Sequence, residues 1–192
     1  LFADRTIVVT GGGSGIGRCT AHELAGLGAR LALVGRKPDK LDAVRAEIAA
    51  AAPEAAGSVS THVCDIREEA LVRDTVAAIL AEHGRIDGLF NNAGGQFPAP
   101  LRDISQKGFE TVLRNNLTGG FLMARECYTQ WMETHGGAIV NIIADIWHGM
   151  PGMGHSGAAR AGMMSFTETA ACEWAAAGVR VNAVAPGWIA SS

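Results

Sequence analysis

The chain has 192 residues, of which 16 are Lys or Arg and 19 are Asp or Glu, so its formal net charge is −3 at pH 7. That length suits a single domain with its own hydrophobic core. Although 48% of the residues are hydrophobic, no apolar run approaches the roughly 20 residues of a membrane-spanning helix. The slightly acidic balance, with only short basic clusters, also argues against a nucleic-acid partner.

The cysteines are few and scattered. Cys19, Cys64, Cys127 and Cys172 show no Cys-x-x-Cys spacing, and no charged-then-apolar leader precedes the first predicted strand. This usage predicts a reduced, cytoplasmic protein in which each cysteine is a small, buried apolar side chain. No metal site is predicted.

Short β-branched runs alternate with helical patterns along the chain, which is typical of βαβ crossovers that build a parallel sheet. The six predicted strands span residues 6–10, 30–34, 58–64, 88–91, 137–143 and 179–184. The five predicted helices span about 15–27, 41–52, 68–83, 106–131 (with Ser105 as the N-cap) and 158–177.

This order of elements predicts one α/β domain over residues 1–192, a doubly wound parallel sheet in three α/β/α layers. The chain ends at Ser192, just past the sixth predicted strand. We therefore expect the native protein to be longer, with a later segment that closes a substrate pocket.

A glycine-rich turn stands directly between the first predicted strand and the first predicted helix. From Thr10 to Gly17 it reads Thr-Gly-Gly-Gly-Ser-Gly-Ile-Gly. Glycines allow positive φ and close approach of the backbone to a pyrophosphate, and the free N–H groups at the helix start bind the anion. The turn predicts a Rossmann-fold dinucleotide site, with contacts from Gly11, Ser14, Gly15, Ile16 and Gly17.

The end of the second predicted strand favours NADP(H) over NAD(H). Arg36 and Lys37 stand where an NAD-binding protein carries a carboxylate for the ribose 2′-hydroxyl. Arg36, supported by Lys37, is suited to pair with a 2′-phosphate, and a solvated basic turn is the alternative. After the third strand, Asp65 is either an acceptor for the adenine amino group or a helix N-cap.

Four motifs, in order, resemble the short-chain dehydrogenase/reductase family over residues 4–191. They are the turn from Thr10 to Gly17, Asn91-Asn92-Ala93-Gly94, Asn116 in Asn-Leu-Thr-Gly, and the run from Arg180 to Gly187. The resemblance implies that Asn91 lies beside the cofactor, that Ile189 holds the carboxamide through its backbone, and that Ser191 touches the pyrophosphate. It also implies cofactor contacts from Ile66, Asn92, Ala93, Gly94, Pro186 and Gly187.

The catalytic positions depart from the family pattern of Ser, Tyr and Lys. Arg160 stands in the place of the Lys, Ser156 in the place of the Tyr, and Ile143 in the place of the Ser, while Asn116 keeps its usual identity.

The run from His155 to Gly162, with Asn141-Ile142-Ile143 and Gly94-Gly95-Gln96-Phe97, is similar to the peroxisomal trans-2-enoyl-CoA reductase branch. The 2,4-dienoyl-CoA reductases are a looser match, because they keep the Lys. The likeness implies NADPH-dependent reduction of the 2,3 double bond of a 2-enoyl thioester.

The absence of a tyrosine at position 156 fits the reduction of a conjugated double bond better than the reduction of a ketone. Ketone reduction leaves an alkoxide that a positioned acid such as Tyr must protonate. In conjugate reduction the charge develops on the thioester oxygen as an enolate, to which Ser156 can donate a hydrogen bond, and the α-carbon proton can come from water. Arg160 stays charged, is suited to hold the nicotinamide ribose hydroxyls, and cannot relay a proton.

Two further roles stay open. Asn116 either holds a structural water or bridges N–H and C=O groups in the middle of the long helix. In the loop after the fifth strand, Asp145, His148 and His155 are candidate proton donors, or surface residues.

Two other functions also stay open: a carbonyl reductase of the same family that uses an unusual acid such as His155, and a non-catalytic NADP-binding protein. The expected partner is a small acyl thioester. The family resemblance implies a homotetramer or dimer, with which the apolar residues Trp131, Phe166 and Trp174 are compatible, although the same residues suit a core. A peroxisomal address would lie after Ser192.

Overall fold

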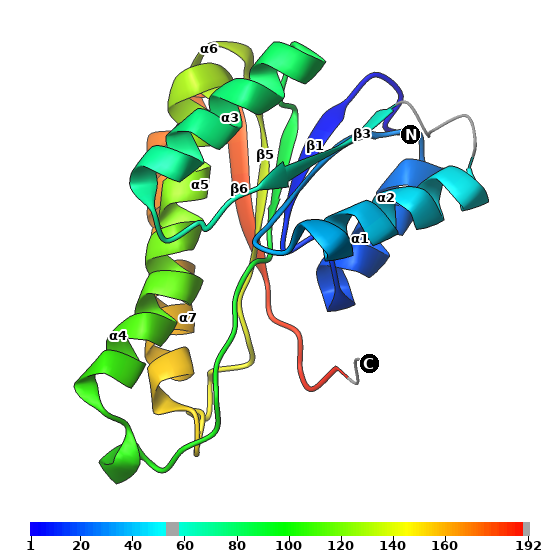
Figure 1. Ribbon diagram of the computed structural model, residues 1–192. Helices are drawn as coiled ribbons and strands as arrows, with labels where there is room; N and C mark the ends of the chain where they lie inside the picture. Colours follow the sequence, from blue (N-terminus) through cyan, green and yellow to red (C-terminus); the bar gives the residue numbers. More distant parts are fainter. Residues whose placement is uncertain (53–57, 190–192) are drawn as a thin grey trace.

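The computed structural model describes residues 1–52 and 58–189, and its centre is a six-stranded parallel sheet with the strand order β3-β2-β1-β4-β5-β6 (Figure 1). The strands are β1 (Thr6–Thr10), β2 (Arg30–Gly35), β3 (Val59–Val63), β4 (Gly88–Asn91), β5 (Gly137–Ile142) and β6 (Val179–Val184). Each lies within one residue of its predicted bounds. The predicted doubly wound sheet is confirmed.

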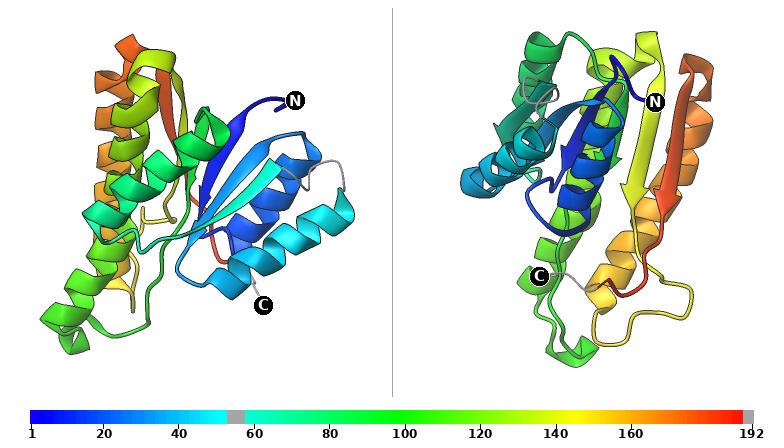
Figure 2. Two further views of the ribbon diagram at one scale, coloured as in Figure 1. Left: turned by 45° about the horizontal axis from the view of Figure 1, so that its top comes forward. Right: turned by 90° about the vertical axis from the view of Figure 1, so that its right-hand side faces the viewer.

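Helices cover both faces of this sheet. They are α1 (Gly15–Gly26), α2 (Pro38–Ala51), α3 (Glu69–His83), α4 (Gln106–Leu113), α5 (Gly119–Cys127), α6 (Glu133–His135) and α7 (Gly154–Glu173). α1 and α2 pack on one face, and α3, α5 and α7 pack on the opposite face (Figure 1, Figure 2). Val8 and Val9 belong to opposite cores because side chains alternate along a strand. None of the described helices is long and apolar enough to cross a membrane.

The long helix predicted after Ser105 is a continuous run of three α-helical and two π-helical segments. The π-helical segments, Arg114–Thr118 and Tyr128–Met132, separate α4, α5 and α6. Ser105 is the N-cap as predicted, and its Oγ accepts a hydrogen bond from the Gly108 N–H at 3.1 Å. π-Helical segments occur frequently at functional sites, and the first one contains Asn116.

The predicted bounds of the fifth helix were wrong. α7 begins at Gly154, four residues before the predicted start, and ends at Glu173, after which Ala175–Ala177 form a separate 3-10 turn. Glycine is frequent around the start of α7, as it is in loops. The positive φ angles, however, occur at Gly149 and Gly152, which precede the helix. The shift brings His155 and Ser156 into the first turn of α7.

Two of the four cysteine predictions were also wrong. Cys64 and Cys127 are buried, and burial raises the pKa of the Cys127 thiol to about 12. Cys19 and Cys172 are exposed on α1 and α7. An amphipathic pattern in the sequence does not show whether a small residue such as Cys lies on the buried or on the exposed side of the helix.

The aromatic residues considered for an oligomer contact pack against the core of this chain. Trp131, Phe166 and Trp174 are half-buried beside the larger hydrophobic cluster. The Trp174 ring stacks on Tyr128 with 4.3 Å between the centroids, and the Phe166 ring meets Trp174 edge-on. This arrangement favours the core interpretation of all three.

A buried polar ladder joins the central strands to the helices behind them. Asn91 on β4 donates hydrogen bonds to the Gly120 carbonyl at 2.7 Å and to Asn141 on β5 at 3.0 Å, and Asn141 donates to Thr167 on α7 at 2.9 Å. Asn141 is completely buried. Because buried polar groups are costly when unpaired, the ladder fixes β4, β5, α5 and α7 relative to one another.

We expect the substitution Asn141→Ala to lower the free energy of unfolding by about 2 kcal/mol, because it removes two buried hydrogen bonds and leaves a small cavity. Urea denaturation measures this loss. Asn182→Ala on β6 is the control, because Asn182 is an exposed asparagine of the neighbouring strand. Equal losses in the two variants would contradict the role of the ladder.

Candidate functional site

The turn between β1 and α1 brings backbone groups unusually close together. Gly11 has a φ of +67°, and a Cβ atom placed on Gly17 would lie 2.3 Å from the Gly11 carbonyl oxygen. Only glycine at position 17 allows α1 to start this near the end of β1. The free N–H groups of the first turn of α1 therefore face the carboxyl edge of the sheet, where they can bind an anion.

The end of β4 is held against this turn by the Thr10 side chain. Thr10 Oγ1 accepts hydrogen bonds from the N–H groups of Asn92 and Ala93, both at 2.9 Å, and Asn92 Nδ2 donates to the Thr10 carbonyl at 3.0 Å. β1 and β4 are neighbours in the sheet, but the chain leaves them toward opposite faces. Such a switch point opens a crevice between the two strand ends, which is where doubly wound sheets bind ligands.

Two adjoining cavities, of about 250 Å³ and 390 Å³, lie in this crevice. Gly11, Ser14, Ala93 and Gly94 line both of them. Together the cavities form a groove across the carboxyl ends of the strands, with the anion-binding turn at its middle. An extended dinucleotide fits this layout, with its pyrophosphate at the turn and one nucleoside in each cavity.

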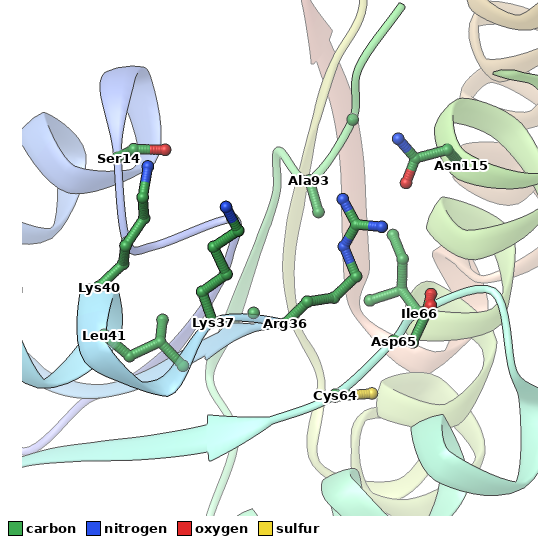
Figure 3. Close-up of a pocket in the computed structure, with 14 residues that line it drawn as sticks. Ser14, Arg36, Lys37, Lys40, Leu41, Cys64, Asp65, Ile66, Ala93 and Asn115 are labelled. Carbon is green, nitrogen blue, oxygen red and sulfur yellow. The ribbon is translucent and has the colours of Figure 1, made fainter. Parts of the chain in front are cut away.

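The first cavity has basic side chains on one side. Arg36, Lys37 and Lys40 line it, and in Figure 3 the end of Lys40 lies beside Ser14 while the Arg36 guanidinium lies near Ala93 and Ile66. The sequence analysis did not single out Lys40, which lies in the first turn of α2, directly after the basic pair Arg36-Lys37. The end of β2 contributes no carboxylate to this cavity, so the chemistry of its lining suits a phosphate.

Asp65 and Ile66 line the opposite side of the first cavity. Hydrogen bonds from the Arg67 side chain, with the nearby Arg36 charge as a smaller effect, lower the pKa of Asp65 to about 2 despite partial burial. Asp65 also accepts the Arg67 N–H at 3.1 Å. The N-cap of α3 is Glu68, so the N-cap interpretation of Asp65 was wrong, while its predicted contact with adenine stays a prediction.

Ser156 and Arg160 line the second cavity from the same face of α7, one helical turn apart. Ile143, at the position where the family resemblance implies Ser, also lines this cavity, together with Pro186, Gly187 and Ile189. Gln96 and Met150 also reach this cavity; both come from loops, which show no periodic pattern along the chain. Ser191 lies outside the described residues.

Arg160 is a buried cation without an acidic partner. Its Nη1 donates to the Ile142 carbonyl at 2.5 Å, and its Nη2 lies where a Cβ on Gly94 would approach to 2.7 Å. No ion pair involves it among the described residues, and its buried Nε has no hydrogen-bond partner. Burial lowers the pKa of Arg160 to about 10, so the guanidinium is still charged at neutral pH. A buried, unpaired positive charge marks a place where a bound group supplies polar or negative atoms.

Asn116 bridges two chain segments through its side-chain amide. Its Nδ2 donates to the Gly95 carbonyl at 2.7 Å and to the Val112 carbonyl at 2.9 Å, while its Oδ1 accepts the Gly95 N–H at 3.1 Å. Of the two sequence-level interpretations, the structure shows the bridge between N–H and C=O groups. Asn116 thus positions the loop that carries Gly94 and Gly95 beside Arg160.

His155 does not line either cavity. It is completely buried, its Nδ1 accepts the Ser156 N–H at 2.8 Å, and its ring lies edge-on to Phe97 at 4.5 Å. This hydrogen bond places the imidazole proton on Nε2, which is buried without a partner. Asp145 and His148 line an adjoining third cavity of about 270 Å³ rather than the second one. No candidate proton donor therefore faces Ser156.

The comparison with protein families agrees with this geometry. The family model described as short chain dehydrogenase matches residues 5–192. The chain belongs to the short-chain dehydrogenase family. As a member of this family it is an oxidoreductase that binds a nicotinamide cofactor.

Relatives of the chain differ in activity. Levodione reductase from Leifsonia aquatica is 38% identical over 98% of this chain and 70% of that protein. A probable 2,4-dienoyl-CoA reductase from Bacillus subtilis is 33% identical over 95% of this chain and 72% of that protein. A solved structure of the citronellol catabolism dehydrogenase AtuB from Pseudomonas aeruginosa PAO1 is 67% identical, with a TM-score of 0.93, and covers 99% of this chain and 77% of that one.

We expect Gly17→Ala to weaken binding of the nicotinamide cofactor by at least about tenfold, because the added Cβ forces the turn away from α1. Titration of the cofactor by intrinsic fluorescence measures the effect. Gly26→Ala is the matched control on the same helix, since a Cβ there meets nothing within 4 Å. Unchanged affinity in Gly17→Ala would contradict the assignment of the turn.

Proposed function

We propose that the protein is an NADP(H)-dependent reductase of the 2,3 double bond of a 2-enoyl thioester. The observation that carries the proposal is the lining of the second cavity, where Ser156 and Arg160 stand side by side. Among the described residues, Arg160 is the one titratable residue of that lining, which includes no Asp, Glu, His, Tyr, Cys or Lys. The lining therefore provides hydrogen-bond donors and a fixed positive charge, but no acid that can deliver a proton at neutral pH.

Such a cavity suits conjugate reduction. The bound cofactor supplies a hydride, and in an enoyl thioester the β-carbon accepts it while negative charge develops on the thioester oxygen. The chain's contribution is to stabilise that oxygen, and one well-placed donor is worth roughly 3–4 kcal/mol. Ser156 Oγ is the proposed donor. Water is the proposed source of the α-carbon proton, since none of the described residues that line the second cavity is acidic.

Arg160 has a separate proposed task. Its guanidinium holds the cofactor ribose and lowers the energy of nearby negative charge, in place of the family's Lys. Asn116 is proposed to contribute indirectly. Its hydrogen bonds to Gly95 fix the loop against which Arg160 packs. His155, predicted to be catalytic, is buried behind Ser156 and holds the Ser156 N–H; we propose that it positions Ser156 and does not transfer a proton.

NADP(H) is the proposed form of the cofactor. Arg36, Lys37 and Lys40 all reach the first cavity, and Asp65 across it is already paired with Arg67. A 2′-phosphate there gains charge-assisted hydrogen bonds that a 2′-hydroxyl cannot provide.

A second candidate function comes from one comparison. The 67% identity to the citronellol catabolism dehydrogenase of Pseudomonas aeruginosa favours an oxidoreductase acting in the breakdown of citronellol. If the reaction were oxidation of the alcohol itself, a base would have to take the hydroxyl proton, and the second cavity provides none. A thioester formed later in such a breakdown satisfies both observations. The carbonyl reductase and the non-catalytic NADP-binding protein are the other outcomes of the tests below.

Assembly and location stay predictions. The family resemblance predicts a homotetramer or dimer. The cysteine usage predicts a cytoplasmic protein.

We expect NADPH to be oxidised in the presence of crotonyl-CoA and not in the presence of acetoacetyl-CoA, as followed by absorbance of the nicotinamide. Ser156→Ala should lower kcat about 100-fold with an unchanged KM for NADPH, because the enolate oxygen loses its donor. Ser165→Ala, an exposed serine on the same helix, is the control.

The alternatives give different results in the same assay. Turnover of acetoacetyl-CoA alone would support a carbonyl reductase, and reduction of NADP⁺ by citronellol would support an alcohol dehydrogenase. NADPH binding without turnover of crotonyl-CoA, longer 2-enoyl-CoA substrates or the other compounds would support the non-catalytic function. Each of these outcomes contradicts the proposal.

Cofactor preference gives an independent prediction. Arg36→Ala should weaken NADPH binding about 10- to 100-fold and leave NADH binding nearly unchanged, because only the 2′-phosphate loses a charge-assisted hydrogen bond. Arg45→Ala is the control, since Arg45 is exposed on α2, pairs with Asp42 and lies outside both cavities. If both nucleotides lose affinity equally, Arg36 does not read the 2′-phosphate.

A further inference from the structure

Two imidazoles meet at the edge of the sheet, away from the dinucleotide groove. His62 lies on β3, which is the edge strand, and His83 is the last residue of α3. Ser60, two residues before His62 and on the same strand face, lies between them. Its Oγ is 2.8 Å from His62 Nε2 and 2.7 Å from His83 Nε2. Both rings therefore direct the same nitrogen toward one point.

A carboxylate faces the same point from the helix. Glu82 Oε2 lies 3.7 Å from His62 Nε2, and the ligand atoms of His62, Glu82 and His83 all lie within 4.8 Å of one another. Within the described part of the chain, these residues are the sole such group of three. None of them lines the cavities around the glycine turn.

The Ser60 hydroxyl is shared among three groups. Besides the two Nε2 atoms, its Oγ lies 3.4 Å from the Leu31 carbonyl oxygen, to which it can donate its one proton while it accepts from both imidazoles. A cation next to Ser60 would use the lone pairs of both nitrogens at once.

We propose that His62, His83 and Glu82 form a zinc-binding site that clamps the edge strand β3 to the end of α3. Two imidazoles and one carboxylate are an established ligand set for Zn²⁺, which leaves a fourth position for water or for Ser60 Oγ. Zn–N and Zn–O bonds of about 2.0–2.2 Å require ligand atoms about 3.4 Å apart. The exposed Glu82 side chain is free to close the remaining distance, since 56% of its surface is accessible.

The fold fixes the two histidines before any cation arrives. Gly84, with a φ of +75°, ends α3 directly after His83. His62 is held in a strand whose register with β2 pairs it with Val34. The site is invisible in a motif scan because its ligands lie on different elements, 20 residues apart, and meet only through the packing of α3 beside β3. The sequence-level expectation of no metal site rested on the cysteines alone.

Isothermal titration of EDTA-treated protein with ZnCl₂ tests the proposal. We expect one Zn²⁺ per chain, and affinity reduced at least about tenfold in His83→Ala and in Glu82→Gln. Glu82→Gln changes an exposed side chain and so keeps the fold if His83→Ala does not. His22→Ala is the matched control, because His22 also contacts a glutamate, Glu47 at 3.0 Å, but belongs to no such group of three.

Coordination can be observed independently of affinity. With CoCl₂ in place of ZnCl₂, the wild type and His22→Ala should show the intense visible absorption of four-coordinate Co²⁺, and His83→Ala and Glu82→Gln should not. Zinc should also slow amide hydrogen exchange in β3 and in the last turn of α3. Crotonyl-CoA turnover is not part of this readout, so failure of the proposed reaction would leave the zinc result intact.

Three results would overturn the site. The first is the absence of ZnCl₂ binding by the wild type, which would make the cluster a hydrogen-bonded His-Ser-His group only. The second is equal zinc affinity in the wild type, His83→Ala and Glu82→Gln. The third is loss of zinc binding in the His22→Ala control to the same degree.

Discussion

The site depends on how closely the turn after β1 approaches the end of β4. The Gly17 backbone packs against the Gly11 carbonyl, and the Thr10 hydroxyl holds the two N–H groups that follow β4. These contacts fix the crevice at the point where the crossovers change faces. Every other functional residue is placed relative to it: Arg36 beyond one side of the turn, and Ser156 and Arg160 beyond the other. A small displacement of the turn would therefore change the position of a bound cofactor relative to Arg36 and relative to Arg160.

Arg160 shows the conflict between stability and function in this chain. A buried guanidinium with one carbonyl contact and no carboxylate destabilises the folded state. The surrounding structure tolerates it because α7 is anchored elsewhere, through Thr167 to Asn141, and through the Met163 and Ala170 side chains in the core. The polar ladder between β4, β5 and α7 is thus what permits an unpaired charge to face the cavity. Functional sites commonly keep such local costs, offset by the rest of the fold.

Much of the fold could be predicted because the strand signals are strong: the six runs are short, most are rich in β-branched residues, and clear helical periods separate them. The glycine turn could be predicted because its chemistry is local in sequence. The start of α7 could not, since a glycine-rich run allows both a loop and a first helical turn. The burial of His155 depends on Phe97, almost 60 residues earlier, and the exposure of Cys19 depends on which side of α1 meets the sheet. Long-range packing of this kind leaves no periodic trace in the sequence.

The two halves of the groove differ in the kind of chemistry that their residues provide. The half that holds the proposed 2′-phosphate and the pyrophosphate uses backbone geometry and basic side chains, and it needs no group that changes its protonation. The other half is lined by Ser156 and Arg160, neither of which can transfer a proton at neutral pH. A cavity of this composition can still lower the energy of an anion that forms away from the carbon receiving hydride, because fixed donors and charge act without proton transfer. A serine at position 156, where the family resemblance implies a tyrosine, therefore supports the proposed reduction of a conjugated double bond.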